Sequence, residues 1–246
     1  MQPLRVTVWN ENFHEQTDEP VRLLYPEGMH GAIAKGLSVD AGLQIRTATF
    51  DDPEHGLTED VLKETDVLLW WGHRKHEAVS DAVVERVVRR VWDGMGFLAL
   101  HSAHISKPFR RLMGTPCMLN WRVADENERV WVVNPAHPIA AGIDQCIEIE
   151  KSEMYSEPFG VPEPDESVFI SWFKGGEVFR SGCCWRRGLG KIFYFGPGHQ
   201  TYPIYHHPGV HQVLRNAVRW ATPSEAPPIV WARVPPEQAR ESFAGK

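Results

Sequence analysis

Histidine side chains gather directly after several apolar runs of the sequence. They include His73, His101, His104 and His199, and each apolar run has the composition of a buried β-strand. In a doubly wound sheet the loops at the carboxyl ends of the strands converge on one crevice, so these imidazoles are expected to meet there. Imidazole groups gathered in one cleft can bind a divalent metal ion or transfer protons near neutral pH. The sequence therefore predicts a histidine-rich pocket at that edge of the sheet.

A divalent metal ion, with zinc as the first candidate, is one expected use of this pocket. The predicted ligands are His73, His104, His199 and the carboxylate of Glu153. Zinc held by three protein ligands keeps a coordination position for water or a substrate hydroxyl, which would support hydrolysis, isomerisation or proton abstraction. For each histidine the alternative stays open that it only hydrogen-bonds to neighbouring backbone.

General acid-base catalysis is the second expected use of the same groups. The predicted catalytic residues are His101 and Ser102 after the fourth strand, Glu11 after the first, and Tyr155. Tyr155 lies two residues from Glu153 in a strand-like stretch, so the two side chains point the same way and can form a carboxylate-phenol pair. The alternative for this pair is a solvated strand edge.

A nucleophilic serine is the least supported of the catalytic alternatives. Ser102 follows a strand where this fold class can place a nucleophile on a sharp strand-to-helix turn, but Leu100-His101-Ser102-Ala103-His104 lacks the glycines of G-x-S-x-G. We therefore expect Ser102 to hydrogen-bond or to cap a helix. No cysteine lies in this neighbourhood, so a cysteine-dependent glutamine amidotransferase reaction is not expected.

The elements that must position these groups alternate through the first half of the chain. Strands are predicted at 4–9, 45–50, 66–71 and 97–100, with helices over 20–37, 59–64 and from Ser80 to Gly94. This alternation predicts a flavodoxin-like α/β fold with a mostly parallel sheet and helices on both faces.

The second half has few helical patterns before a closing helix at 211–221. Short strands at 130–133, 147–149, 168–173, 178–180 and 192–195 are separated by Gly and Pro turns, and 186–191 resembles a hairpin tip. Antiparallel strands are therefore expected to extend the parallel sheet. One domain over residues 1–222 follows, with a C-terminal extension at 223–246 that packs on the domain or on a partner subunit, as in a homo-oligomer.

Composition narrows the classes of partner and the compartment. The net charge of −6 lacks the cationic field that nucleic acid or an anionic membrane requires, and no apolar run is long enough to span a bilayer. The first residues lead directly into a strand, so a cytoplasmic location is expected. No glycine-rich phosphate loop is present, so no nucleotide cofactor is expected. Ten tryptophans suit a heavy aromatic core or stacking on sugar rings.

Several strings together resemble the ThuA-like (trehalose utilization) family of the class I glutamine-amidotransferase-like superfamily. They are Val8-Trp9-Asn10-Glu11, Trp70-Trp71-Gly72-His73, Leu100-His101-Ser102-Ala103-His104, Glu153-Met154-Tyr155, Ser171-Trp172-Phe173 with Gly175-Gly176-Glu177-Val178-Phe179-Arg180-Ser181-Gly182, and Pro197-Gly198-His199. They cover nearly all of residues 4–222. Gln200 follows His199 where the family pattern often places an acidic residue.

The resemblance implies an amidotransferase-like sheet without the superfamily's cysteine nucleophile, and a role in the use of trehalose or a related disaccharide. Two functions stay open. The first is a metal-assisted enzyme that acts on a sugar or keto-sugar by acid-base chemistry, and the second is a non-catalytic sugar-binding or accessory subunit. In both cases the expected ligand is a small sugar.

Overall fold

A computed structural model describes residues 3–224 and 235. All strands in this part of the chain form a single sheet in the order β2-β1-β3-β4-β9-β8-β7-β5-β6. The strands are β1 (Leu4–Asn10), β2 (Leu43–Thr49), β3 (Val67–Trp71), β4 (Gly96–Leu100), β5 (Asn120–Val132), β6 (Cys146–Ser156), β7 (Glu166–Phe173), β8 (Val178–Arg187) and β9 (Gly190–Phe195).

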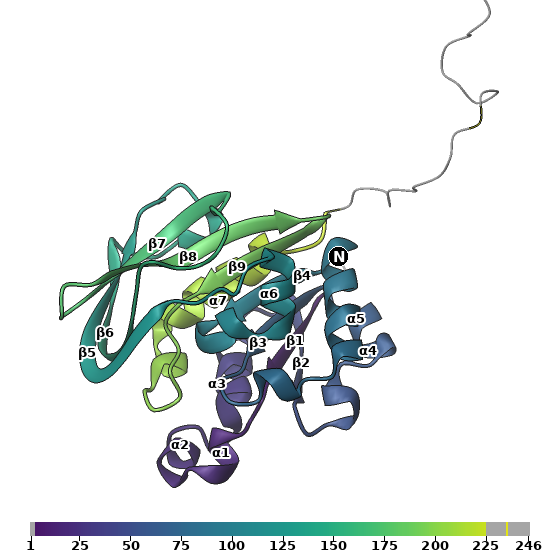
Figure 1. Ribbon diagram of the computed structural model, residues 1–246, viewed down its shortest axis with the longest axis horizontal. Coiled ribbons are helices and arrows are strands. Elements are labelled where there is room, and N and C mark those ends of the chain that lie inside the picture. The colour runs from purple at the N-terminus through teal and green to yellow at the C-terminus, as the bar shows by residue number, and fades with distance from the viewer. Residues whose placement is uncertain (1–2, 225–234, 236–246) are drawn as a thin grey trace, which may run out of the picture.

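The sheet has a parallel half and an antiparallel half (Figure 1). Strands β2, β1, β3, β4 and β9 run parallel, and β8, β7, β5 and β6 continue the sheet in antiparallel pairing. The predicted hairpin tip is confirmed, since Arg187 pairs with Gly190 where β8 turns into β9. The α/β fold class predicted from the sequence is therefore confirmed, and the antiparallel strands are longer than their apolar runs indicated.

Most helices connect strands of the parallel half. The helices are α1 (His14–Thr17), α2 (Glu19–Leu24), α3 (Gly28–Leu37), α4 (Glu59–Lys63), α5 (Asp81–Trp92), α6 (Lys107–Met113) and α7 (Pro208–Trp220), with short 3-10 helices η1 (Pro53–Gly56), η2 (His76–Ala78), η3 (His101–Ile105), η4 (Pro138–Ala140) and η5 (Ile204–His206). Of these, η4 lies between β5 and β6, and η5 and α7 follow β9. The single helix predicted over 20–37 is wrong. Two helices form there, because Pro26 lacks the N–H group that a continuing helix needs.

Two apolar clusters pack on opposite faces of the sheet. Apolar side chains of α3 and α7 form one cluster with residues such as Leu69 and Ile149, and those of α5 and α6 form the other with residues such as Leu68 and Tyr155. Neighbouring residues of a central strand, such as Leu68 and Leu69, therefore enter different clusters, as the alternation of side chains requires. Helices on both faces leave the strand ends as the place where polar groups can gather.

Strand β6 is bulged near its middle. Glu126 of β5 pairs with Ser152, and Glu128 pairs with Ile149. Between these two pairs β5 advances by two residues and β6 by three. The extra residue reverses the alternation of side chains, so residues on either side of the bulge face different layers. Ile149 packs in the α3 and α7 cluster, whereas Tyr155 packs in the α5 and α6 cluster. The bulge thus turns Tyr155, and Glu153 two residues before it, toward the carboxyl end of β4.

The predicted extension at 223–246 falls almost entirely outside the described residues. Helix α7 ends at Trp220, and Lys191 donates hydrogen bonds to the carbonyl groups of Trp220 and Thr222. Within residues 3–224 and 235, none of the helices has the length and apolar character needed to cross a membrane.

Candidate functional site

Loops from four parallel strands are tied together at their carboxyl ends. The Ser102 hydroxyl after β4 donates to the Gly72 carbonyl after β3 at 2.7 Å, and the Trp71 indole N–H donates to the Gly198 carbonyl after β9 at 3.0 Å. Glu11 after β1 accepts backbone N–H groups of the loop that begins at His73. Three loops that are far apart in sequence are therefore fixed around β4, at the edge where the sequence predicts a pocket.

His101, the first residue of η3, makes the sharp turn directly after β4. Its φ is +51°, in the left-handed region that L-residues seldom adopt and that histidine tolerates better than most. The expectation that Ser102 forms a hydrogen bond is confirmed, because its hydroxyl donates to the Gly72 carbonyl while His101 makes the turn. His101 packs closely against Gly198. A Cβ atom added at Gly198 would lie only 2.8 Å from the Cβ of His101, so this contact requires glycine.

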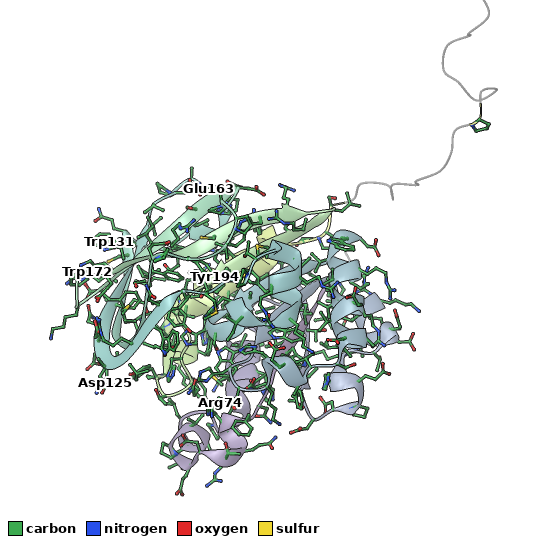
Figure 2. All side chains as sticks on the ribbon, in the orientation of Figure 1. Arg74, Asp125, Trp131, Glu163, Trp172 and Tyr194 are labelled. Carbon is green, nitrogen blue, oxygen red and sulfur yellow. The ribbon has the colours of Figure 1, made fainter. Side chains whose placement is uncertain are left out.

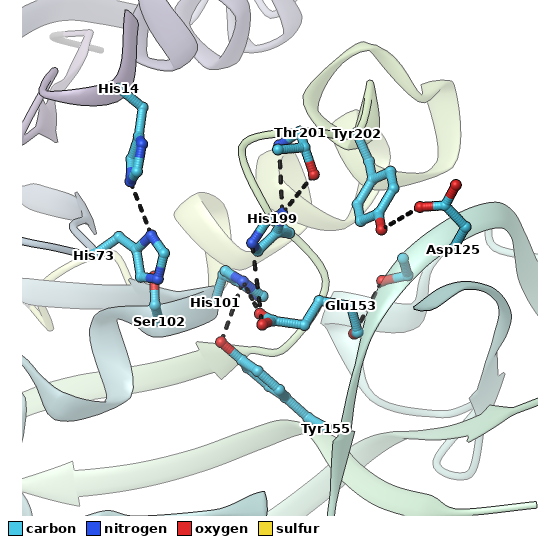
Figure 3. Close-up of polar contacts among 12 residues, drawn as sticks. His14, His73, His101, Ser102, Asp125, Glu153, Tyr155, His199, Thr201 and Tyr202 are labelled. Carbon is cyan, nitrogen blue, oxygen red and sulfur yellow. Dashed lines mark hydrogen bonds and ion pairs between the residues drawn. The ribbon is translucent and has the colours of Figure 1, made fainter. Parts of the chain in front are cut away.

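The imidazole of His101 joins a carboxylate and a phenol. Its Nδ1 lies 2.8 Å from the Gly196 carbonyl oxygen, which can only accept, so Nδ1 carries a proton. Its Nε2 lies 3.0 Å from Oε2 of Glu153 and 3.1 Å from the hydroxyl of Tyr155. Nε2 therefore faces both groups and either donates to Glu153 or accepts from Tyr155. Figure 3 shows the three side chains converging.

The predicted carboxylate-phenol pair is present and buried. Glu153 and Tyr155 are 6% and 4% exposed, so the alternative of a solvated strand edge is wrong. Burial raises the pKa of Glu153, but hydrogen bonding to His101 and the nearby histidines outweigh burial, and its pKa is lowered overall. Burial raises the pKa of Tyr155 well above its ordinary value, which keeps the phenol protonated.

His199 faces the second oxygen of Glu153. The Thr201 hydroxyl lies 2.8 Å from Nδ1 of His199 and the Thr201 backbone N–H points to the same atom, so Nδ1 accepts and the ring proton is on Nε2. Nε2 lies 4.0 Å from Oε1 of Glu153, beyond hydrogen-bonding distance. Burial, reinforced by His101, lowers the pKa of His199 to about 4, so the ring is neutral near pH 7. A substrate hydroxyl between the two groups can accept from His199 and donate to Glu153.

His73 completes the wall of the site on the side of β1 and β3. Its ring centre lies 5.8 Å from that of His199, and its Nδ1 is 3.0 Å from Nε2 of His14 on α1. Burial lowers the pKa of His73 to about 3, and burial also lowers the pKa of His14. Both residues are only partly buried, in contrast to His101, so they form the more accessible side of the site.

Glu11 holds the loop that carries His73. Its carboxylate accepts the backbone N–H groups of His73, Arg74 and Lys75 at 2.7 to 2.9 Å. The side chain is 1% exposed and no hydrogen bond joins it to the His101 cluster. In this arrangement the predicted catalytic carboxylate acts by positioning His73.

His104 lies apart from the other predicted metal ligands. Its Nδ1 is 2.7 Å from the Cys117 carbonyl oxygen, and its ring packs edge-on against Tyr155, Phe159 and Tyr194. Burial lowers its pKa to about 3. Within residues 3–224 and 235 no group of three or more His, Cys, Asp or Glu side chains is arranged to hold a metal ion. His73, Glu153 and His199 come together, but the predicted set of four does not form one cage.

A tyrosine-aspartate pair that the sequence did not indicate flanks the site. The Tyr202 ring lies 5.5 Å from that of His199, and its hydroxyl donates to Asp125 at 2.8 Å. Asp125 lies in the bulged part of β5 with φ +50° and also pairs with Lys151. Figure 2 shows Asp125 at the lower left, on the curved part of β5. No local pattern reveals this pair, because the bulge depends on how β5 and β6 pair.

The two adjacent tryptophans do not form a sugar-stacking platform. Trp70 and Trp71 face opposite layers, as alternation predicts, but each is at most 1% exposed. Their role is packing, with Trp70 stacked on Trp9 and Trp71 bonded to the Gly198 carbonyl.

The sequence of this chain matches one known protein family over nearly its whole described length. The sequence model of the family described as "Trehalose utilisation" matches residues 5–221, nearly the whole described domain. The chain belongs to the ThuA family. The match includes the four strand-end loops and β6, so every group of the site lies within the ThuA domain.

Solved structures similar to this ThuA domain share its fold at low sequence identity. A ThuA-like protein from Parabacteroides merdae matches with TM-score 0.68 at 12% identity, covering 92% of this chain and 94% of that one. A ThuA-like protein from Bacteroides uniformis matches with TM-score 0.61 at 17% identity, covering 89% and 92%. PurLQS from Thermotoga maritima matches with TM-score 0.53 at 11% identity, covering 89% and 99%. A search of curated protein sequences found no match. The glutamine-amidotransferase-like fold expected from the sequence is confirmed.

Proposed function

We propose that this ThuA family protein is an enzyme that transfers protons on a sugar or keto-sugar. The observation that carries the proposal is the convergence of Glu153 and Tyr155 on Nε2 of His101, at 3.0 and 3.1 Å, with His101 held in a left-handed turn. Buried groups of perturbed pKa and strained backbone concentrate at functional sites. The trehalose description of the family supports a sugar as the substrate class.

Each group has a distinct role in the proposed proton transfer. Oε1 of Glu153 takes a proton from the substrate, either from a hydroxyl or from a carbon next to a carbonyl group. His199 donates a hydrogen bond from Nε2 to the substrate oxygen, and His73 borders the same space. Hydrogen bonding to His101 stabilises the charged form of Glu153, and the proton that Glu153 gains is returned to the substrate or exchanged with solvent. The neutral state of His73 and His199 suits an uncharged, hydroxyl-rich ligand.

Deuterium incorporation tests the proposal directly. The protein is incubated in D₂O with trehalose, related disaccharides and their keto-sugar forms, and products are followed by NMR and mass spectrometry. Glu153→Gln should reduce turnover by about 10²-fold or more, as expected on removal of a general base. Glu148→Gln, on an exposed position of the same strand, is the matched control and should retain activity. Absence of exchange and product with every substrate, or full activity in Glu153→Gln, would count against the proposal.

The zinc prediction needs its own measurement. The arrangement of the predicted ligands gives no preformed cage, so no step above is assigned to a metal ion. Metal analysis of protein purified without a histidine tag, compared with His73→Ala and His199→Ala, decides whether these residues bind zinc. Stoichiometric zinc that both variants lose would support ligation, and zinc retained by both would contradict it.

A non-catalytic sugar-binding role is the second candidate function. It is favoured by the low pKa values of His73 and His199, which make both rings hydrogen-bonding groups rather than proton carriers near pH 7. Calorimetry that shows disaccharide binding weakened by His199→Ala, with no product under any condition, would support binding alone.

A further inference from the structure

Glu128 on β5 is a buried carboxyl group that the proposed reaction does not use. Its side chain is 1% exposed, and the Ser171 hydroxyl on β7 lies 2.6 Å from Oε1. Its second oxygen, Oε2, has no hydrogen-bond partner among the described residues. A buried carboxylate with an unpaired oxygen carries a large desolvation cost. The neutral acid avoids most of this cost, because one oxygen then donates to Ser171 and only a carbonyl oxygen is left unpaired.

The surroundings of Glu128 contain little that would stabilise a negative charge. Burial raises its pKa to about 7, against smaller opposing effects of Ser171, Ser152 and His101. Tyr194 on β9 also interacts with Glu128, and burial raises the pKa of Tyr194 well above its ordinary value. Near neutral pH, the neutral and charged forms of Glu128 are therefore both accessible.

Glu128 lies where β6 changes register before the site. It pairs with Ile149, and the next paired residue of β6 is Ser152, directly before Glu153. The Ser152 side chain is 1% exposed, and its hydroxyl lies 3.3 Å from the Glu153 carbonyl oxygen. Glu128, Ser152 and Ser171 thus form a small polar layer, from three adjacent strands, at the bulge that turns Glu153 and Tyr155 toward His101.

We propose that Glu128 is a positioning residue which, as a neutral carboxylic acid, holds the bulged segment of β6 so that Glu153 and Tyr155 meet His101. Ionisation of Glu128 places an unpaired charge in this layer and loosens the segment over residues 152–155. Glu128 does not contact the substrate in this proposal. Only its activity measurement depends on the function proposed above.

Infrared spectroscopy tests the protonation state without any substrate. The wild-type protein should show the carbonyl stretch of a neutral carboxylic acid at about pH 6, which disappears as the pH rises through about 7. Glu128→Gln should lack this band, and Glu148→Gln should retain it. Absence of the band from the wild type, or its persistence in Glu128→Gln, would overturn the proposal.

Hydrogen exchange tests the positioning role, again without substrate. Glutamine keeps a neutral donor toward Ser171, whereas leucine has similar size and no polar group. Amides of residues 152–155 should exchange faster in Glu128→Leu than in the wild type, and at the wild-type rate in Glu128→Gln below pH 7. Equal exchange in Glu128→Leu and the wild type would show that Glu128 does not hold the segment.

The pH profile of turnover tests the link to the site. Glu128→Gln should match wild-type kcat within about twofold below pH 7. One pH unit above its pKa a carboxyl group is about ten-elevenths ionised, so Glu128→Gln should exceed the wild type about tenfold near pH 8. Parallel profiles of the two proteins would contradict the positioning role. If no substrate is turned over, the function proposed above fails, and the infrared and exchange results still decide the role of Glu128.

Discussion

Oε2 of Glu11 accepts the backbone N–H of His73 at 2.7 Å, so a carboxylate at the end of β1 sets the place of a histidine at the end of β3. Sixty-two residues separate the two in sequence. The same carboxylate accepts the next two N–H groups of the loop. Replacement of Glu11 therefore tests whether the loop depends on this single side chain.

Glu11→Ala should destabilise the protein by at least about 2 kcal/mol, because buried N–H groups lose their acceptor. Glu11→Gln keeps one acceptor oxygen and should cost less. Urea unfolding at pH 7 measures both values. If Glu11→Ala lowers the free energy of unfolding by less than about 0.5 kcal/mol, as neutral surface substitutions do, the loop is stable without the Glu11 carboxylate.

Gly198→Ala should prevent close packing of the β9 loop against β4. Its φ is +153°, and an added Cβ would lie 2.2 Å from the Tyr205 hydroxyl and 2.8 Å from Cβ of His101. Overpacking of this kind costs about 1–3 kcal/mol, and the backbone conformation adds to it. Thermal unfolding measures the effect. Tyr205→Phe in the Gly198→Ala background should recover part of the loss, and no recovery would assign the cost to His101.

Stability should fall as the pH drops below about 6.5, because buried histidines stay neutral in the folded protein. The pKa of His104 is lowered from 6.5 to about 3, so its contribution is present above pH 6.5 and is lost progressively as the pH falls through that window. Between pH 6.5 and pH 5 the loss for this residue is about 2 kcal/mol. Urea unfolding at pH 7 and pH 5 should show a smaller difference in His104→Asn than in the wild type. Equal differences would mean that His104 is not the residue that titrates.

Glu128 should have the opposite effect on stability, which it lowers as the pH rises from about 4.5 to about 7. Its pKa is raised above the ordinary value of 4.5 to about 7, so its contribution to stability is present below pH 4.5 and is lost as the pH rises toward 7. Glu128→Gln should therefore show a steeper gain in stability between pH 5 and pH 7 than the wild type. An unchanged slope in urea unfolding would place the Glu128 pKa outside this range.

Residues beyond Thr222 are predicted to support a homo-oligomer, because Ile229, Val230 and Trp231 lie between prolines as an apolar docking segment. Light scattering on the whole chain and on a chain that ends at Thr222 measures the mass of each. The shorter chain should be the smaller species. The same number of subunits in both proteins would show that the extension does not contribute to the interface.

The sequence predicted which side chains gather better than what each of them contacts. Strand-end placement indicated correctly that His73, His101 and His199 would gather, and alternation indicated the Glu153 and Tyr155 pair. His104 could not be separated from them, because its position differs from that of His101 by only three residues. The orientation of the His104 ring depends on its hydrogen bond to the Cys117 carbonyl, which lies in a loop that no sequence pattern predicts.

Sequence alone determined the alternation of strands and helices from β1 to β4 and the edge where polar groups collect, because these follow from local periodicity and from the direction of parallel strands. Tertiary structure decided which atoms meet. The proton on Nδ1 of His101 is fixed by Gly196, 95 residues away, and the facing of Glu153 is fixed by a bulge between β5 and β6. Such contacts depend on the pairing register of strands and on packing between distant segments. The local sequence pattern around each residue does not encode either of them.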